Sequence, residues 1–243
     1  MSLQGQTALV TGGARGIGRA ICLALADLGA DVGFCHYDDP EADATLAAIN
    51  QRSRGFAMSA DVADEQAVEG FFDAACKALG APDILVNNAG ILRESPLAET
   101  KAADFDRVIA VNLRGSFLAS RAFVRRTDCG RIINIASDLG LLGRENMLAY
   151  TASKGAIITM TRTLARELAP GILVNAVAPG STETDMTSPQ NMSPEAIAKD
   201  LDTPLARFGQ PREIADMVAF LASPQSGFIT GQCFGVNGGS VML

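Results

Sequence analysis

The feature that most constrains the fold is a regular alternation of short apolar runs with longer segments of helical periodicity. The runs are rich in Val, Ile, Leu and Phe and begin near Thr7, Asp31, Phe56, Asp83, Arg131, Ile172 and Cys233. The helical segments between them are 16–29, 41–53, 64–79, 101–126, 149–169 and 211–222. A strand that is apolar along its whole length is covered on both faces, as in a parallel sheet. Its alternation with helices predicts an α/β protein whose doubly wound parallel sheet of about seven strands has helices on both faces.

The alternation breaks once, at about 180–208, a segment with three prolines and no expected strand. Within it, Ser193 before Pro194 and Glu195 is an N-cap signal that predicts a short helix ending near Leu201. A long insertion in a tight α/β domain is usually functional, so we expect a substrate lid; a mobile surface excursion is the alternative. Without internal repeats or a linker, residues 1–243 are expected to form one domain.

Composition excludes several classes of function. A charged fraction of 19% and an apolar fraction of 48% indicate a folded core, and a net charge of −7 argues against a nucleic-acid partner. No apolar run is long enough to span a membrane and no secretory signal is present, so a cytoplasmic location is expected. One histidine, His36, and five cysteines without a C-x-x-C pair argue against a catalytic metal site.

The first apolar run leads directly into glycines that open a helix. Residues 7–18 read TALVTGGARGIG. Phosphates bind at helix N-termini because free N–H groups and the positive end of the helix dipole meet there. Glycines let the backbone turn sharply and approach a pyrophosphate closely. The spacing Thr-Gly-x-x-x-Gly-x-Gly differs from the better-known Gly-x-Gly-x-x-Gly dinucleotide motif.

This glycine spacing resembles the cofactor loop of the short-chain dehydrogenase/reductase family, in its branch of about 250 residues. Further segments match the same family in order: Asp61-Val62, Asn87-Asn88-Ala89-Gly90, Ser137, Tyr150-Thr-Ala-Ser-Lys154 and Pro179-Gly180. The resemblance implies a Rossmann-type fold and transfer of a hydride between NAD(P) and a carbonyl/alcohol pair. It implies cofactor contacts at Gly12, Arg15, Gly16, Ile17, Gly18, His36, Tyr37, Asp61, Val62, Asn88, Ala89, Gly90, Tyr150, Lys154, Pro179, Gly180 and Thr182.

Four residues are candidates for catalysis. Tyr150 and Lys154 stand at i and i+4, so they share one face of a helix, where the ammonium would favour the phenolate. Ser137 follows a strand, where ligands of parallel sheets bind. The resemblance implies that Tyr150 is the acid/base, that Lys154 tunes it and holds the nicotinamide ribose, and that Ser137 orients the substrate oxygen. It also implies that Asn112 keeps a proton-relay water near the lysine.

The choice between the two nicotinamide cofactors depends on the end of the second strand, where an acidic residue binds the ribose 2′-OH of NAD and an arginine suits the 2′-phosphate of NADP. The family's two diagnostic positions fall on His36 and Tyr37, which are neither. Arg15 and His36 favour NADP, whereas Asp38 and Asp39 would repel a phosphate if they turned inward. We therefore expect a slight preference for NADP over NAD.

The substrate is constrained only to a small or medium carbonyl or secondary alcohol. The overall pattern is similar to 3-oxoacyl-carrier-protein reductases of the family. A sugar or polyol dehydrogenase remains equally open, since 170–174 lacks a basic residue and an acidic carrier protein would be repelled by a chain of charge −7. A silent NAD(P)-binding redox sensor is the alternative from another class, against which the complete Ser-Tyr-Lys set argues. The resemblance also implies a homotetramer formed through 101–126, 149–169 and 231–243.

Overall fold

The computed structural model describes residues 1–188, 190 and 192–242, in which seven strands form one sheet in the order β3-β2-β1-β4-β5-β6-β7. Every pairing between neighbouring strands is parallel. The strands are β1 (Thr7–Thr11), β2 (Asp31–His36), β3 (Gly55–Ser59), β4 (Ile84–Asn87), β5 (Gly130–Ile135), β6 (Ile172–Pro179) and β7 (Cys233–Val236). Each begins within one residue of its predicted start, which confirms the predicted doubly wound α/β fold.

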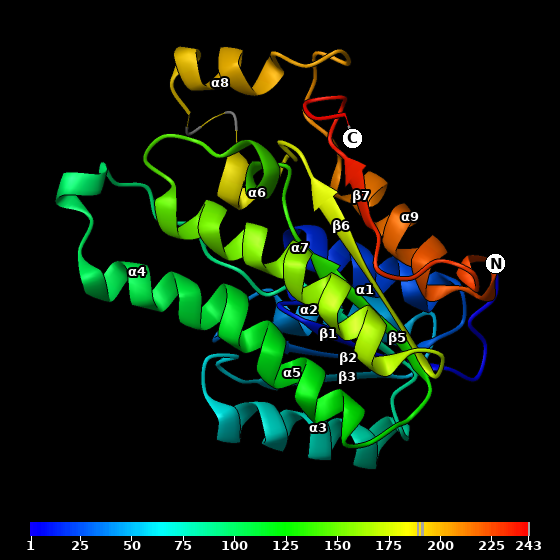
Figure 1. Cartoon of the computed structure of the whole chain (residues 1–243). Helices are drawn as coiled ribbons and strands as arrows, with labels where there is room; N and C mark the ends of the chain where they lie inside the picture. Colours follow the sequence, from blue (N-terminus) through cyan, green and yellow to red (C-terminus); the bar gives the residue numbers. More distant parts are fainter. Residues whose placement is uncertain (189, 191, 243) are drawn as a thin grey trace.

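Helices connect the strands and cover both faces of the sheet (Figure 1). They are α1 (Gly16–Asp27), α2 (Ala42–Asn50), α3 (Glu65–Leu79), α4 (Ala102–Ile109), α5 (Gly115–Val124), α6 (Leu139–Leu142), α7 (Leu148–Leu168), α8 (Pro194–Leu201) and α9 (Pro211–Ala222). As predicted, the Ser193 side chain caps α8, accepting a hydrogen bond from the Ala196 amide. Among the described residues, no helix combines the length and the apolar character that a membrane span requires.

The segment 101–126, predicted as one helix, differs from that prediction in its middle. A π-helical turn, η2 (Ala110–Arg114), joins α4 to α5. Such a turn widens the helix by one residue, and it is often found at functional sites. Here it buries Val111 and Asn112 against the interior of the protein.

Apolar cores on both faces of the sheet hold the layers together. One lies between the sheet and α1, α2 and α9, with Ile21, Phe34 and Val218 fully buried. The other lies between the opposite face and α3, α5 and α7, with Phe72 and Phe123 fully buried. Because both faces are covered, strands such as β1 have every side chain buried, which explains why the sequence shows continuous apolar runs.

The site is positioned by the reversal of strand order at the middle of the sheet. β1 pairs with β2 on one side and with β4 on the other. The connections from these strands therefore leave in opposite directions and open a crevice at their carboxyl ends.

The chain after β1 turns at Gly12, where φ is +68°. Helix α1 then packs so closely against this turn that a Cβ on Gly18 would lie 1.9 Å from the Gly12 carbonyl oxygen.

This close approach predicts a strong effect of a single methyl group. Gly18→Ala should lower the free energy of unfolding by about 1–3 kcal/mol, because the loop and α1 must separate. Gly70→Ala is the matched control: Gly70 lies inside α3, where an added Cβ would meet only the end of Met58, at 4.0 Å. It should raise stability by about 0.5–1 kcal/mol through helix propensity. Denaturant unfolding checks both, and equal changes in the two variants would contradict the packing argument.

Candidate active site

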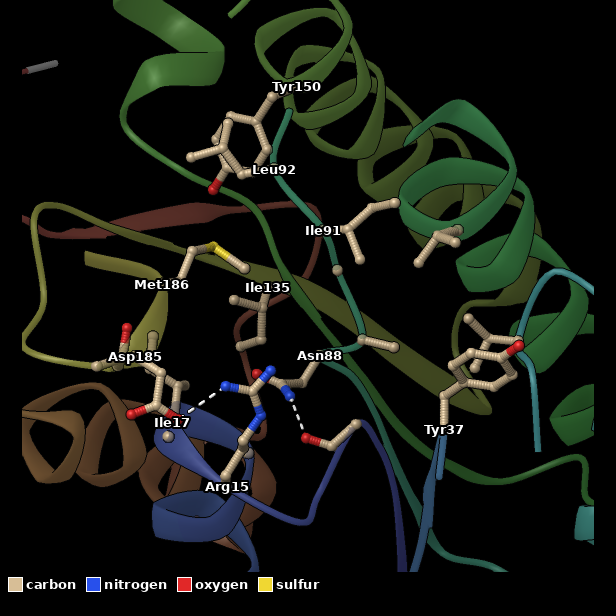
Figure 2. Close-up of a pocket in the computed structure, with 18 of the residues that line it drawn as sticks. Arg15, Ile17, Tyr37, Asn88, Ile91, Leu92, Ile135, Tyr150, Asp185 and Met186 are labelled. Atoms are coloured by element: carbon tan, nitrogen blue, oxygen red, sulfur yellow. Dashed lines mark hydrogen bonds and ion pairs between the residues drawn. The ribbon is translucent and has the colours of Figure 1, made fainter. Parts of the chain in front are cut away.

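A cleft of about 720 Å³ lies over the carboxyl ends of the central strands (Figure 2). All the predicted cofactor contacts and three of the predicted catalytic residues line it: Gly12, Arg15, Gly16, Ile17, Gly18, His36, Tyr37, Asp61, Val62, Asn88, Ala89, Gly90, Ser137, Tyr150, Lys154, Pro179, Gly180 and Thr182. The fold thus brings together residues from segments that are far apart in the sequence. The fourth predicted catalytic residue, Asn112, does not line the cleft.

The glycine loop is held in place by Asn88 and Thr11. The Asn88 side-chain amide donates to the carbonyl oxygens of Gly12 (2.8 Å) and Thr11 (3.1 Å). The Thr11 hydroxyl in turn accepts from the backbone amides of Asn88 and Ala89. Arg15, the N-cap residue of α1, makes no side-chain cap, and among the described residues no side chain accepts from the first amides of this helix, which border the cleft. This arrangement suits an anion such as a pyrophosphate.

Arg15 is engaged by two carboxylates, Asp39 just after β2 and Asp185 in the segment 180–208. Its Nε donates to Asp39 at 2.8 Å and its Nη1 to Asp185 at 2.7 Å, the second of which is drawn in Figure 2. The Asp39 side chain therefore turns inward and pairs with Arg15. This is the orientation in which Asp38 or Asp39 would repel a phosphate. His36 Nδ1 accepts from the Asp39 backbone amide, while the Asp38 carboxylate accepts from the Ser59 hydroxyl.

A second arginine borders the same end of the cleft. Arg107, from α4, forms an ion pair with Asp61 at 2.8 Å and lies 5.8 Å from the centre of the Tyr37 ring. Asp61 also accepts from the Ala63 amide, so its carboxylate is fixed from two sides. The three side chains form a wall of the cleft beyond the ends of β2 and β3. Arg107 was not predicted to belong to the site, because nothing in the sequence of α4 distinguishes it from a surface arginine.

Tyr150 and Lys154 project from α7 into the middle of the cleft, with the ammonium nitrogen 5.7 Å from the centre of the phenol ring. Lys154 is 5% exposed, and its Nζ donates to the Ile135 carbonyl oxygen at 2.7 Å. Burial lowers the pKa of Lys154 to about 8. Burial raises the pKa of Tyr150 to about 12; hydrogen bonding with Ser137 opposes this rise, while the charge of Asp138 adds to it.

These pKa shifts define what the pair can do. The raised pKa keeps the Tyr150 phenol neutral, and a neutral phenol can donate a proton to an oxygen that develops negative charge. A neutral proton donor in the cleft suits the reduction of a carbonyl group. Ser137, buried at the end of β5, supplies a second hydroxyl in the same cleft. Its Oγ accepts from the Leu139 amide and donates to the Asp138 carboxylate, both at 3.1 Å.

Asn112 lies behind the cleft wall. Its side chain accepts from the Ile91 amide (2.8 Å) and donates to the Ile91 carbonyl oxygen (3.0 Å) and to Ser153 (3.1 Å). An ideal Cβ on Gly90 would lie 3.5 Å from Asn112 Oδ1 and 3.6 Å from Lys154 Nζ. Asn112 therefore fixes the segment Asn88–Ile91, which follows β4, to η2 and α7, immediately behind the lysine.

Comparison with known proteins identifies the family. A family model described as enoyl-(acyl carrier protein) reductase matches residues 12–241. The 3-oxoacyl-[acyl-carrier-protein] reductase of Synechocystis sp. is 42% identical over 100% of this chain and 99% of that protein. The chain belongs to the short-chain dehydrogenase/reductase family. This confirms the resemblance expressed by the sequence motifs.

Solved structures of the family are similar over nearly the whole chain. A dehydrogenase/reductase from Sinorhizobium meliloti 1021 has a TM-score of 0.95 and 43% identity, covering 99% of this chain and 97% of that one. A short-chain dehydrogenase/reductase from Serratia marcescens has a TM-score of 0.92 and 38% identity, covering 98% and 99%. A blue fluorescent protein from a metagenomic library, in complex with NADPH, has a TM-score of 0.94 and 40% identity, covering 100% of both chains.

As a member of the short-chain dehydrogenase/reductase family, the protein is an NAD(P)-dependent oxidoreductase that acts on a carbonyl/alcohol pair. The predicted reaction class is confirmed, and the alternative of a silent redox sensor is not favoured. Among the described residues, no three His, Cys, Asp or Glu side chains gather as a metal-binding group.

The cleft is also lined by residues that were not predicted from the sequence. Ile91, Leu92 and Met186 contribute apolar surface to the cleft that holds Tyr150 (Figure 2), while Arg93 and Glu94 also line it and are exposed. Ile91 and Leu92 directly follow the matched Asn-Ala-Gly segment, so their position after β4 was a usable signal. Met186 belongs to the predicted lid segment and carried no such signal.

Proposed function

We propose that this protein reduces the 3-oxo group of an acyl thioester to a 3-hydroxyl group with NADPH as the hydride donor. The observation that carries the proposal is the neutral Tyr150 phenol beside Lys154 and Ser137, in a cleft continuous with the glycine loop. The substrate class is supported by relatives such as the Synechocystis reductase, 42% identical over their full length. The apolar surface of Ile91, Leu92 and Met186 suits an acyl chain.

The residues of the cleft fit a dinucleotide. Gly12 and Gly16 both have positive φ angles, so the loop can turn beneath a pyrophosphate without a Cβ in the way. The uncapped amides of α1 would hold the pyrophosphate. Asp61 and Val62 would contact the adenine, and Lys154 would hold the nicotinamide ribose. When bound, the nicotinamide supplies the hydride.

The chain's own residues would supply the proton and the orientation. Ser137 would donate a hydrogen bond to the substrate carbonyl oxygen, while Tyr150 would deliver its phenolic proton to the same oxygen as negative charge develops. The buried Lys154 ammonium stabilises the phenolate that remains. Asn112 positions the segment behind the lysine, where a water molecule would return a proton to the pair.

Tyr150→Phe tests this assignment. Turnover should fall by ~10²–10⁴-fold, the range typical of lost general acid catalysis, while the affinity for NADPH changes little. Absorbance of the reduced nicotinamide with a 3-oxoacyl thioester measures turnover, and fluorescence titration measures cofactor affinity. Retention of more than half of the wild-type turnover would contradict the role of Tyr150. Tight NADPH binding by the wild type without turnover of any carbonyl would instead favour a sensor.

NADPH is proposed over NADH because Arg15 of the glycine loop reaches the residues that follow β2 and His36 occupies the position of the family's acidic residue. The structural neighbour in complex with NADPH supports the same choice. Asp39 opposes it, since its carboxylate pairs with Arg15 and would repel a 2′-phosphate. The preference is therefore expected to be modest in the wild-type protein.

Asp39→Asn should strengthen the preference. The substitution removes a negative charge and weakens the hold on Arg15 Nε, so the ratio of kcat/KM for NADPH over NADH should rise about tenfold, equivalent to ~1.4 kcal/mol. Asp43→Asn is the matched control, because it removes the same charge from the first turn of α2. An equal rise in the control would show a general charge effect. A wild-type preference for NADH above about tenfold would overturn the choice of NADPH.

We further propose that 180–208 acts as a lid and that the protein is a cytoplasmic homotetramer. Residues 189 and 191 of the lid lie outside the described residues. The lid residues Thr184, Asp185, Met186 and Thr187 line the cleft.

The tetramer is supported by exposed apolar side chains. Phe117 of α5 and Leu148 of α7 are each 47% exposed, on helices that are expected to meet a second copy of the chain. Five free cysteines agree with a reducing compartment.

The assembly has a direct test. Light scattering at micromolar concentration should give the mass of four chains. Phe117→Asp should shift the protein toward smaller species, because it places a charge in the apolar contact. A single-chain mass for the wild type would refute the tetramer.

A further inference from the structure

The residue after Ser137 is a buried carboxylate that the reaction described above does not use. Asp138 is 6% exposed and stands at the start of α6. Its Oδ1 accepts from the Leu139 amide at 2.8 Å and lies 3.1 Å from Ser137 Oγ. Its Oδ2 accepts from the Ser240 hydroxyl, in the C-terminal segment, at 2.5 Å. Asp138 thus connects the chain's C-terminal turn to the hydroxyl that faces the substrate.

This contact decides where the single proton of the Ser137 hydroxyl points. An ionised carboxylate only accepts, so it takes the Ser137 O–H and leaves oxygen lone pairs facing the cleft. A carbonyl oxygen placed there would meet lone pairs instead of a donor. A protonated Asp138 can itself donate to Ser137 Oγ, and the Ser137 O–H is then free to donate to the carbonyl oxygen.

We propose that Asp138 is a positioning residue that sets the donor direction of the Ser137 hydroxyl, and that the form with Asp138 protonated is the one that reduces a carbonyl substrate. The inference rests on the proposed function, in which Ser137 binds the substrate oxygen. It requires no proton transfer between Asp138 and Ser137, only a reversal of the hydrogen bond between them.

The surroundings determine the pH at which the reversal occurs. Burial raises the pKa of Asp138, while the Ser240, Ser137 and Leu139 hydrogen bonds oppose this, and the charge of Asp200 adds to the increase. Asp200 comes from α8 and is paired with Arg144, which precedes α7. From α7, the Tyr150 phenol interacts with the Asp138 charge, whereas Lys154 is directed to the Ile135 carbonyl. Carbonyl reduction should therefore be fully effective below the Asp138 pKa and decline as pH rises through it.

The test is the pH profile of kcat/KM for reduction of a short 3-oxoacyl thioester with saturating NADPH. The wild type should show a decline of about tenfold per pH unit above the Asp138 pKa. Asp138→Asn should lack this decline, because the amide is neutral at every pH and its N–H can donate to Ser137. Ser240→Ala should move the decline to higher pH, because it removes a donor that stabilises the ionised carboxylate.

The control is a second helix-capping aspartate. Asp64 accepts from the Gln66 and Ala67 amides at the start of α3, and it does not line the cleft. Asp64→Asn should leave the profile unchanged. The proposal is overturned if Asp138→Asn and Ser240→Ala keep the wild-type profile, or if Asp64→Asn alters it in the same way. Failure of the proposed function would give a different result, because Ser137→Ala and Tyr150→Phe would then keep the turnover of the wild type.

Discussion

The parallel pairing of β1 with β4 is the constraint on which the rest of the structure depends. It reverses the strand order at the centre of the sheet and separates the connections that follow these two strands. Gly12 and Asn88 follow them directly, and the hydrogen bond between the Asn88 side chain and the Gly12 carbonyl holds the two loops together across the crevice. The reversal of strand order is therefore sufficient to explain a cleft at this place. The identity of its ligand depends on the side chains that the neighbouring elements add.

Desolvation is the second constraint, since it acts on both members of the catalytic pair. A pKa of about 8 for Lys154 means that its charged form is disfavoured by roughly 3 kcal/mol relative to water. The Ile135 carbonyl compensates for part of the lost hydration. Tyr150 is held in its neutral form by the same burial. Such a site is prepared to donate a proton, and it becomes a base only when positive charge is added nearby.

The fold could be predicted closely because each structural element leaves a local pattern. β1 is apolar throughout because it is covered on both faces, and Ser193 marks the start of α8 because its hydroxyl satisfies a free amide. The π-helical turn at Ala110–Arg114 could not be predicted, since one extra residue does not disturb the apolar spacing of the flanking helices. Asn112 was identified by family resemblance, yet its burial behind Ile91 depends on this turn.

Two of the charged residues that could not be predicted depend on pairing between distant segments. Arg107 of α4 pairs with Asp61, which follows β3, and Asp138 pairs with Ser240 of the C-terminal segment. Periodicity and motif spacing describe one segment at a time, so they contain no information about such partners. The position of a carboxylate beside Ser137 was visible in the sequence, but its contact with the hydroxyl and its burial were not.

The pairing of the cleft's charges determines how a protein of net charge −7 can bind an anionic cofactor. Arg15 and Arg107 each form ion pairs with aspartates, so neither presents an uncompensated positive charge. A further source of attraction is the N-terminus of α1, whose amides are fixed by the fold and do not titrate. Pyrophosphate binding can therefore tolerate changes in the surrounding carboxylates. A 2′-phosphate at Arg15 would compete with Asp39 for the guanidinium, so we propose that the Arg15–Asp39 pair governs the choice between the two cofactors.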